Sequence, residues 1–259
     1  MLRTILGIDV GASGIKGALV DTETGELLAP RERLVTPQPA TPMAMGMTVK
    51  ELIKLLDYDG PAVGVGFPSI VQHGTARSAA NIDKSWIGAS VEDSFGEATG
   101  RQIYALNDAD AAGLASYSFG IGKNMEGVTL FLTLGTGIGS ALFVDGTLVP
   151  NTELGHVYLK GMKIVAEKYA ANSIRKRDKL SFEEWGKRLN QYLHHVDRLL
   201  TPDQIILGGG VCKKFNQYKE YLDCRPRVVA AELRNEAGIV GAAMYASIMH
   251  KKHMSSALG

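Results

Sequence analysis

The chain contains the same glycine-rich hairpin pattern twice. Residues 5–21 read ILGIDVGASGIKGALVD, and residues 128–145 read VTLFLTLGTGIGSALFVD. In each copy an apolar, β-branched run enters a glycine-rich turn and a second such run leaves it, which is typical of two paired strands. When Gly11 is placed on Gly135, Asp21 falls on Asp145. The repetition predicts two lobes of similar design, although chance recurrence is an alternative in a chain with 30 glycines.

The first turn does not match the common phosphate-binding loops. A dinucleotide fingerprint needs Gly-x-Gly-x-x-Gly opening a helix, and the P-loop needs Gly-Lys-Ser/Thr. Here the turn GASG leads into the strand-like run IKGALV. Taken alone, this stretch is as compatible with a simple tight turn as with a phosphate-binding one.

Helical and strand patterns alternate around the two hairpins. Apolar residues at Val49, Leu52 and Ile53 predict an amphipathic helix over residues 41–57. Ser181 and Glu184 have the spacing of a capping box, which predicts the start of another helix. Hairpins beside crossover units indicate an α/β chain with mixed sheets. We expect a smaller lobe over 1–108, a larger lobe over 109–259 whose last helix can pack back onto the first, and a central cleft.

Composition disfavours several classes of function, although it does not exclude a local basic groove. At 259 residues and 45% hydrophobic, the chain can bury a large core or two smaller ones. A net charge of +1 offers no bulk attraction for nucleic acid or acidic membranes. Two cysteines are too few for a disulfide framework or a four-cysteine zinc site. The early first strand and the absence of a long apolar run favour a cytoplasmic protein that binds neither nucleic acid nor membrane.

Taken together, the motifs resemble those of the ROK family of sugar kinases. The first hairpin, the second hairpin LGTGIG, an Asn-Asp at a strand end, Glu-x-Gly-His and a late Gly-Gly-Gly occur in the family's order. Within the family, the chain resembles the polyphosphate-dependent glucokinases through SAANIDKSWIG, LGTGIGSALFVDG, ELGH, LSFEEW, GGGVCKK and LRNEAGIVGAA. The resemblance implies the actin-like ATPase fold, with two lobes of ribonuclease-H-like topology. It extends from Gly7 to about Ala246.

The resemblance also implies an activity. A phosphoryl group would pass from inorganic polyphosphate, ATP or both to the 6-hydroxyl of glucose, with Mg²⁺ as cofactor and a homodimer as the expected assembly. The alternatives are an ATP-dependent ROK kinase for another hexose or amino sugar, and a sugar-sensing protein without catalysis. Retention of Asp9 and Asp108 disfavours the sensing protein, and the ELGH motif disfavours an actin-like assembly ATPase.

By the same resemblance, Asp108 is the catalytic base that accepts the hydroxyl proton. From the residues alone, Asn107 or Asp108 could equally be a helix N-cap. A sugar presents neighbouring hydroxyls, which suit an acceptor such as Glu153 beside a donor-acceptor such as His156. The complete sugar-binding set implied by the resemblance is Asn81, Asn107, Asp108, Gly137, Glu153, His156 and Glu167.

Donor phosphates are expected at the glycine turns, where backbone amides and hydroxyls act as donors. A helix start after the late glycines is a further natural anion site. The resemblance places Mg²⁺ at Asp9, commonly through water. The predicted phosphate-binding residues are Gly11, Ser13, Gly14, Lys16, Gly135, Thr136, Gly137, Gly209, Gly210, Lys213 and Lys214.

The chain departs from the family pattern at two points. Ala12 stands where the family has the second of two adjacent glycines. Its methyl group is expected to leave less room for phosphate at the first turn. The stretch after His156, VYLKGMKIV, lacks the cysteines of the family's zinc motif, so no zinc is expected. Lysines and arginines cluster after Gly210, and no aromatic residue is clearly placed to stack on adenine. We therefore expect polyphosphate to be the preferred donor.

Overall fold

The computed structural model describes residues 3–80, 82–232 and 236–257. The chain divides into two compact units, one comprising Met1–Ala115 with Glu236–Gly259 and the other Ser116–Asn235. The first unit thus extends beyond the expected boundary at residue 108 and includes the C-terminal helix. A physical reason is the close approach of the helix that begins at Asp108 to the C-terminal helix, where a Cβ on Gly241 would overlap the Ala111 carbonyl. In the described part of the chain, no helix is long and apolar enough to cross a membrane.

The first unit contains a five-stranded sheet in the order β3-β2-β1-β4-β7. β1, β2 and β3 are antiparallel neighbours, whereas β4 and β7 extend the sheet in parallel with β1. The elements are β1 (Thr4–Gly11), β2 (Gly14–Asp21), β3 (Glu32–Leu34), α1 (Pro42–Leu55), β4 (Ala62–Phe67), β5 (Val71–Gln72), β6 (Thr75–Ala76), η1 (Lys84–Trp86), α2 (Val91–Thr99), β7 (Gln102–Asn107), α3 (Asp108–Phe119, which crosses the unit boundary) and α7 (Ala237–Ala257).

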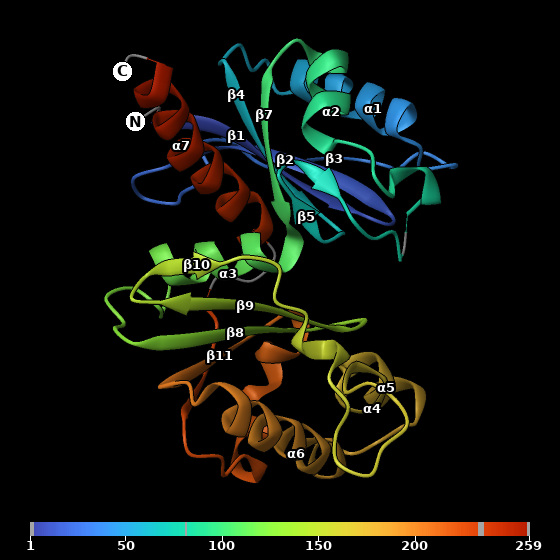
Figure 1. Ribbon diagram of the computed structural model, residues 1–259, viewed down its shortest axis with the longest axis vertical. Helices are drawn as coiled ribbons and strands as arrows, with labels where there is room; N and C mark the ends of the chain where they lie inside the picture. The colour runs from blue at the N-terminus through green and yellow to red at the C-terminus, as the bar shows by residue number, and fades with distance from the viewer. Residues whose placement is uncertain (1–2, 81, 233–235, 258–259) are drawn as a thin grey trace. The chain divides into compact units, whose positions relative to one another are not determined.

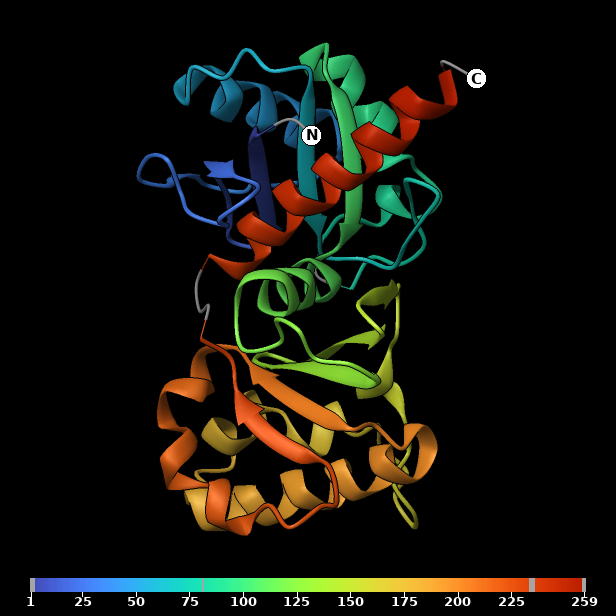
Figure 2. The same ribbon diagram turned by 90° about the vertical axis from the view of Figure 1, so that its left-hand side faces the viewer.

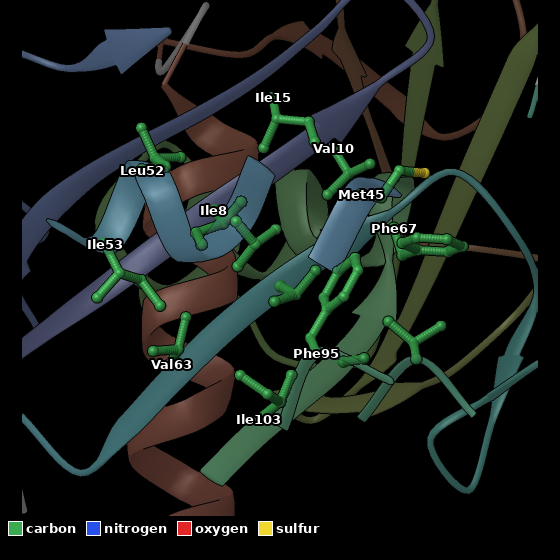
Figure 3. Close-up of a cluster of buried hydrophobic side chains, with 14 of the residues drawn as sticks. Ile8, Val10, Ile15, Met45, Leu52, Ile53, Val63, Phe67, Phe95 and Ile103 are labelled. Atoms are coloured by element: carbon green, nitrogen blue, oxygen red, sulfur yellow. The ribbon is translucent and has the colours of Figure 1, made fainter. Parts of the chain in front are cut away.

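Helices cover both faces of this sheet (Figures 1 and 2). α1 and α2 lie on one face, where Ile8, Val10 and Phe95 belong to a fully buried apolar cluster (Figure 3). α7 crosses the other face, close to Gly7 and Gly64. Successive residues of a strand point to opposite faces, so Ile8 and Val10 enter the core while Asp9 points toward α7.

The second unit repeats the first sheet's topology. Its order is β10-β9-β8-β11-β12, again an antiparallel trio followed by two parallel strands. The predicted duplication is therefore confirmed. The elements are β8 (Val128–Leu134), β9 (Ile138–Val144), β10 (Thr147–Val149), η2 (Leu154–His156), α4 (Glu167–Ala170), α5 (Asn172–Arg177), α6 (Phe182–Leu200), β11 (Gln204–Gly208), η3 (Gly210–Gln217), η4 (Lys219–Tyr221) and β12 (Arg227–Ala230).

Local sequence signals explain several helix ends. Thr41 caps α1, with Pro42 in its first turn, within the predicted range of 41–57. Ser181 and Glu184 make both hydrogen bonds of the predicted capping box at the start of α6. The segment after the late glycines differs from the expected helix, because η3 is a 3₁₀ helix interrupted by non-helical backbone at Lys214. Its amides are therefore less regularly aligned than those of an α-helix start.

Candidate functional site

The predicted residues of the first unit gather at one edge of its sheet. β1, β4 and β7 are parallel, and the register aligns Asp9 with Gly66 and Gly66 with Leu106. The turn after β1 and the start of α3 after β7 consequently lie at the same carboxyl edge, two strand spacings or about 10 Å apart. This edge is where open α/β sheets bind ligands.

The turn between β1 and β2, residues 11–14, is the first glycine turn. Gly11 and Gly14 pair across the hairpin, leaving Ala12 and Ser13 at its tip. The Thr36 hydroxyl donates to the Gly11 carbonyl at 2.6 Å, and the Arg33 guanidinium donates to the Ser13 carbonyl at 2.7 Å. These two bonds fix the turn's backbone from outside. Our sequence reasoning did not identify Thr36 or Arg33, because both lie in a separate segment with no recognisable motif.

Asp9 and Lys16 form an ion pair beside this turn. They are opposite each other on β1 and β2, and the Lys16 Nζ lies 3.1 Å from the Asp9 Oδ2. Gly238, in the first turn of α7, lies against the carboxylate: a Cβ there would be 3.2 Å from the Asp9 Cγ. Lys16 offsets the negative charge of Asp9 in this structure. The nearby N-terminus of α7 also stabilises this charge.

The residues around Asp9 are compatible with Mg²⁺. The ion usually takes one or two carboxylates, keeps several waters and completes its shell with substrate phosphates. The Asp9 side chain is 23% exposed and thus reachable. Across residues 3–80, 82–232 and 236–257, no group of three His, Cys, Asp or Glu side chains is arranged to hold a metal by itself. That the protein lacks zinc stays a prediction.

Asn107 and Asp108 have different surroundings. The Asn107 Oδ1 accepts from the backbone N–H groups of Ala109 at 2.8 Å and Asp110 at 3.3 Å, so Asn107 caps α3. Its Nδ2 donates to the Ser69 carbonyl at 2.9 Å, and the residue is only 9% exposed. A sugar contact by Asn107 is thereby limited to its remaining amide hydrogen. Asp108 is exposed and is not needed as the cap.

The turn between β8 and β9, residues 135–137, is the second glycine turn. The Ser173 backbone N–H donates to the Gly135 carbonyl at 3.0 Å, and its hydroxyl donates to the Thr136 carbonyl at 2.6 Å. A Cβ on Gly135 would have no neighbour within 4 Å, so this part of the turn is open. Ser173 lies in α5 and carried no signal in the sequence.

Glu153 and His156 converge next to the second glycine turn. The His156 Nδ1 lies 3.0 Å from the Glu153 Oε2. Ser140 on β9 holds this segment, because its hydroxyl accepts from the Leu154 backbone N–H at 3.1 Å. Gly155 allows the close approach, since a Cβ there would overlap the Ile138 carbonyl. The spacing of the ELGH motif thus brings both predicted sugar ligands to one place.

Glu167 joins the same cluster. Its carboxylate lies over Gly137, where a Cβ would overlap the Glu167 Oε2, and its Oε1 is 3.0 Å from the Lys168 Nζ. Burial raises the pKa of Glu153, and the negative charge of Glu167 adds to this rise, while His156 opposes it. Gly137 was expected to bring backbone toward the sugar. In the structure its lack of a side chain makes room for a carboxylate.

The late glycines reach the same edge of the second unit. Gly208 pairs with Thr133 in the parallel register of β11 and β8. Gly209 has a φ of +87°, and a Cβ there would lie 2.8 Å from the Leu134 carbonyl. Lys213 and Lys214 follow and are exposed, with no ion pair to either lysine among the residues that the structure describes. The predicted Asn81 lies outside the described residues.

Comparison with known proteins gives a consistent result. The ROK family model matches residues 5–169. The chain is 47% identical over 248 residues to a polyphosphate glucokinase from Mycobacterium tuberculosis, covering 95% of this chain and 92% of that protein. An inorganic polyphosphate/ATP-glucomannokinase from Arthrobacter sp. strain KM matches with a TM-score of 0.88 and 45% identity, over 96% of this chain and 100% of that one. A ROK family glucokinase from Streptomyces griseus, in complex with glucose and AMPPNP, shares the fold with a TM-score of 0.80 and 23% identity, over 95% and 99% of the chains.

These similarities agree with the duplicated sheets. ROK sugar kinases have the actin-like ATPase fold, so the predicted fold class is confirmed. Because the family model covers more than half of the chain and a relative at 47% identity covers nearly all of it, the protein is a member of the ROK family.

Proposed function

We propose that the protein is a glucokinase that transfers a phosphoryl group from inorganic polyphosphate to the 6-hydroxyl of glucose. The observation that carries the proposal is the cluster of Glu153, His156 and Glu167 at the second glycine turn, which offers carboxylate acceptors beside an imidazole. The names of the Mycobacterium tuberculosis and Arthrobacter proteins support the reaction and the donor. The second name makes ATP a second donor and mannose a second acceptor to test.

In the proposed reaction, Asp108 accepts the proton of the glucose 6-hydroxyl as the oxygen attacks the terminal phosphorus. A bond forms between the sugar oxygen and that phosphorus, and the bond to the bridging oxygen breaks. The products are glucose 6-phosphate and a polyphosphate shorter by one phosphate. A positioned carboxylate of this kind orients the hydroxyl as well as taking its proton.

The two glycine turns bind donor phosphates in this proposal. Thr36 and Arg33 hold carbonyls of the first turn, and Ser173 holds carbonyls of the second. Carbonyl oxygens would repel phosphate, so tying them to hydroxyl and guanidinium donors favours anion binding by the turn amides. Asp9 would hold Mg²⁺, whose charge would offset that of the phosphates. The expected homodimer and cytoplasmic location stay predictions.

Glucose binding should depend on the ionised carboxylate of Glu153. We expect Glu153→Gln to weaken glucose binding about tenfold. The reason is that the glutamine amide nitrogen is a donor at a position where a carboxylate oxygen of Glu153 is an acceptor. His156→Ala should weaken it by a similar factor. Calorimetry with glucose measures both effects, and Glu183→Gln, on the exposed side of α6, is a matched control. Unchanged affinity in both variants would remove the pair from the sugar site.

The raised pKa of Glu153 also predicts how the affinity for glucose depends on pH. Burial raises the pKa of Glu153, so its carboxylate protonates at a higher pH than an ordinary glutamate near pH 4.3. If the ionised form binds the sugar, affinity is complete above the raised pKa and falls as pH decreases through it. Glu153→Gln should therefore remove this acid limb from the affinity profile. An identical limb in the variant would assign it to another group.

The donor is tested by supplying one donor at a time. With Mg²⁺ and glucose, we expect glucose 6-phosphate from polyphosphate and less or none from ATP. The reason is the exposed Lys213 and Lys214 at the edge that carries the second glycine turn, since repeated cations suit a polyanion. Activity with ATP and none with polyphosphate would contradict polyphosphate as the donor, while the assignment as a sugar kinase would stand. No activity with either donor would contradict the proposed function.

The lysines themselves provide a sharper form of this test. Replacing Lys213 and Lys214 together by alanine should raise KM for polyphosphate by about fivefold and leave KM for glucose unchanged. The control replaces Lys50 and Lys54, which are exposed on α1, and thus removes the same charge elsewhere. High salt should weaken polyphosphate binding in the wild type more than in the Lys213/Lys214 variant, because screening acts on exposed charges.

A further inference from the structure

Arg33 belongs to a row of charged residues across the first sheet. Asp9 pairs with Lys16 in the register of β1 and β2, and Lys16 pairs with Arg33 in the register of β2 and β3. Residues directly opposite each other on neighbouring strands project from the same face. The row therefore presents a carboxylate, an ammonium and a guanidinium on one face of the sheet, next to the first glycine turn.

The guanidinium of Arg33 lies on the turn itself. It donates from Nη2 to the Ser13 carbonyl at 2.7 Å. A Cβ on Gly14 would be 2.5 Å from the Arg33 Nε and 2.8 Å from both Cζ and Nη2. Gly14 does not have a left-handed φ, so its backbone conformation does not require glycine. In this arrangement the missing side chain of Gly14 leaves the space that the guanidinium occupies.

The charge of Arg33 is available to a ligand. Lys16 is committed to Asp9 at 3.1 Å, whereas Arg33 is exposed and has no carboxylate within ion-pair distance among the described residues. A guanidinium carries five N–H donors in a planar fork that matches two oxygens of a phosphate. One bond to a backbone carbonyl orients the fork and leaves most of its donors unused.

We propose that Arg33 is a donor-binding residue, which contacts phosphate oxygens of the polyphosphate chain at the first glycine turn. The inference rests on the proposed function, and it assigns a specific cation to the donor site of the first unit. It also gives Gly14 a defined purpose: the missing side chain lets the guanidinium reach the turn. Lys16, by contrast, is paired with Asp9 in this structure.

The test measures the donor and the sugar separately. Arg33→Gln should raise KM for polyphosphate about tenfold, the expected loss of a charge-assisted contact, while KM for glucose stays within about twofold. Lys50→Gln removes the same charge from α1, on the other face of the sheet, and should leave both values unchanged. If Arg33→Gln keeps the wild-type KM for polyphosphate, or weakens only glucose binding, the assignment is overturned.

Gly14→Ala tests whether the space at Gly14 positions the Arg33 guanidinium. A Cβ there should displace Arg33 and, like Arg33→Gln, raise KM for polyphosphate. Because both substitutions would remove the same contact, KM for polyphosphate in the double variant should be no higher than in the more impaired single variant. Thermal unfolding of each variant checks that the hairpin still folds. Full additivity of the two effects would show that Gly14 does not act through Arg33 and would overturn that part.

Calorimetry keeps this inference separate from the proposed function. Binding of Mg²⁺-polyphosphate is measured without glucose, in the wild type and in Arg33→Gln. About tenfold weaker binding in the variant supports Arg33 even if the wild type phosphorylates no sugar, whereas equal binding, or none to the wild type, overturns it. If the wild type uses ATP alone, the polyphosphate donor is wrong, and an unchanged KM for ATP in Arg33→Gln overturns the assignment as well.

Discussion

Asp108→Asn should lower glucose turnover by about 10²-fold or more, while glucose affinity stays within a few-fold of the wild type. Asparagine keeps the size and polarity of the side chain but cannot accept the hydroxyl proton. The structure makes this a clean experiment, because Asn107 rather than Asp108 caps α3. The helix start should therefore survive the substitution, and thermal unfolding should show little change.

A matched control is Asp93→Asn. Asp93 is also an exposed carboxylate in the first turn of a helix of the same unit. Its loss should leave turnover unchanged, which separates the chemistry of Asp108 from a general effect of charge. Retention of more than about a third of wild-type turnover by Asp108→Asn, at saturating substrates, would show that another group is the base.

Gly64→Ala should destabilise the first unit by about 3 kcal/mol, at the upper end of overpacking costs. Gly64 lies in the middle of β4, which is buried along its whole length, and a Cβ there would overlap the Ala242 carbonyl of α7. Neither backbone can yield without moving the helix off the sheet. Because Gly238 of α7 also lies against Asp9, the displacement should weaken the proposed metal and donor site as well.

Thermal unfolding measures this effect, and a fall in Tm of about 5–10 °C is expected. Gly96→Ala in α2 is the control, since a Cβ there would be 3.4 Å from the Arg101 carbonyl, an ordinary contact. Alanine is the better helix former, so this variant should be as stable as the wild type or slightly more so. Equal Tm values for Gly64→Ala and the wild type would contradict the close packing of α7 on β4.

Most of the fold could be predicted from local patterns. The duplicated hairpins, the amphipathic helix after Thr41 and the capping box at Ser181 each depend on residues close together in the chain. Hydrophobic periodicity and turn chemistry act over such short ranges. The motifs of the proposed site were equally visible, because Asp9, Asp108 and the ELGH segment are contiguous signals. The domain boundary was less accessible, since it depends on the close approach of α3 to α7, which are more than a hundred residues apart in the chain.

The sequence by itself determined the α/β class, the two repeated hairpins and the residue types available for phosphate and sugar. Only the tertiary structure decided which of two adjacent residues caps α3, that Glu167 lies over Gly137, and that Arg33 lies on Gly14. It also decided which residues hold the turns, since Thr36 and Ser173 come from other segments. The physical reason is that these contacts join residues distant in the chain, whose approach is set by sheet register and close backbone packing rather than by local propensity.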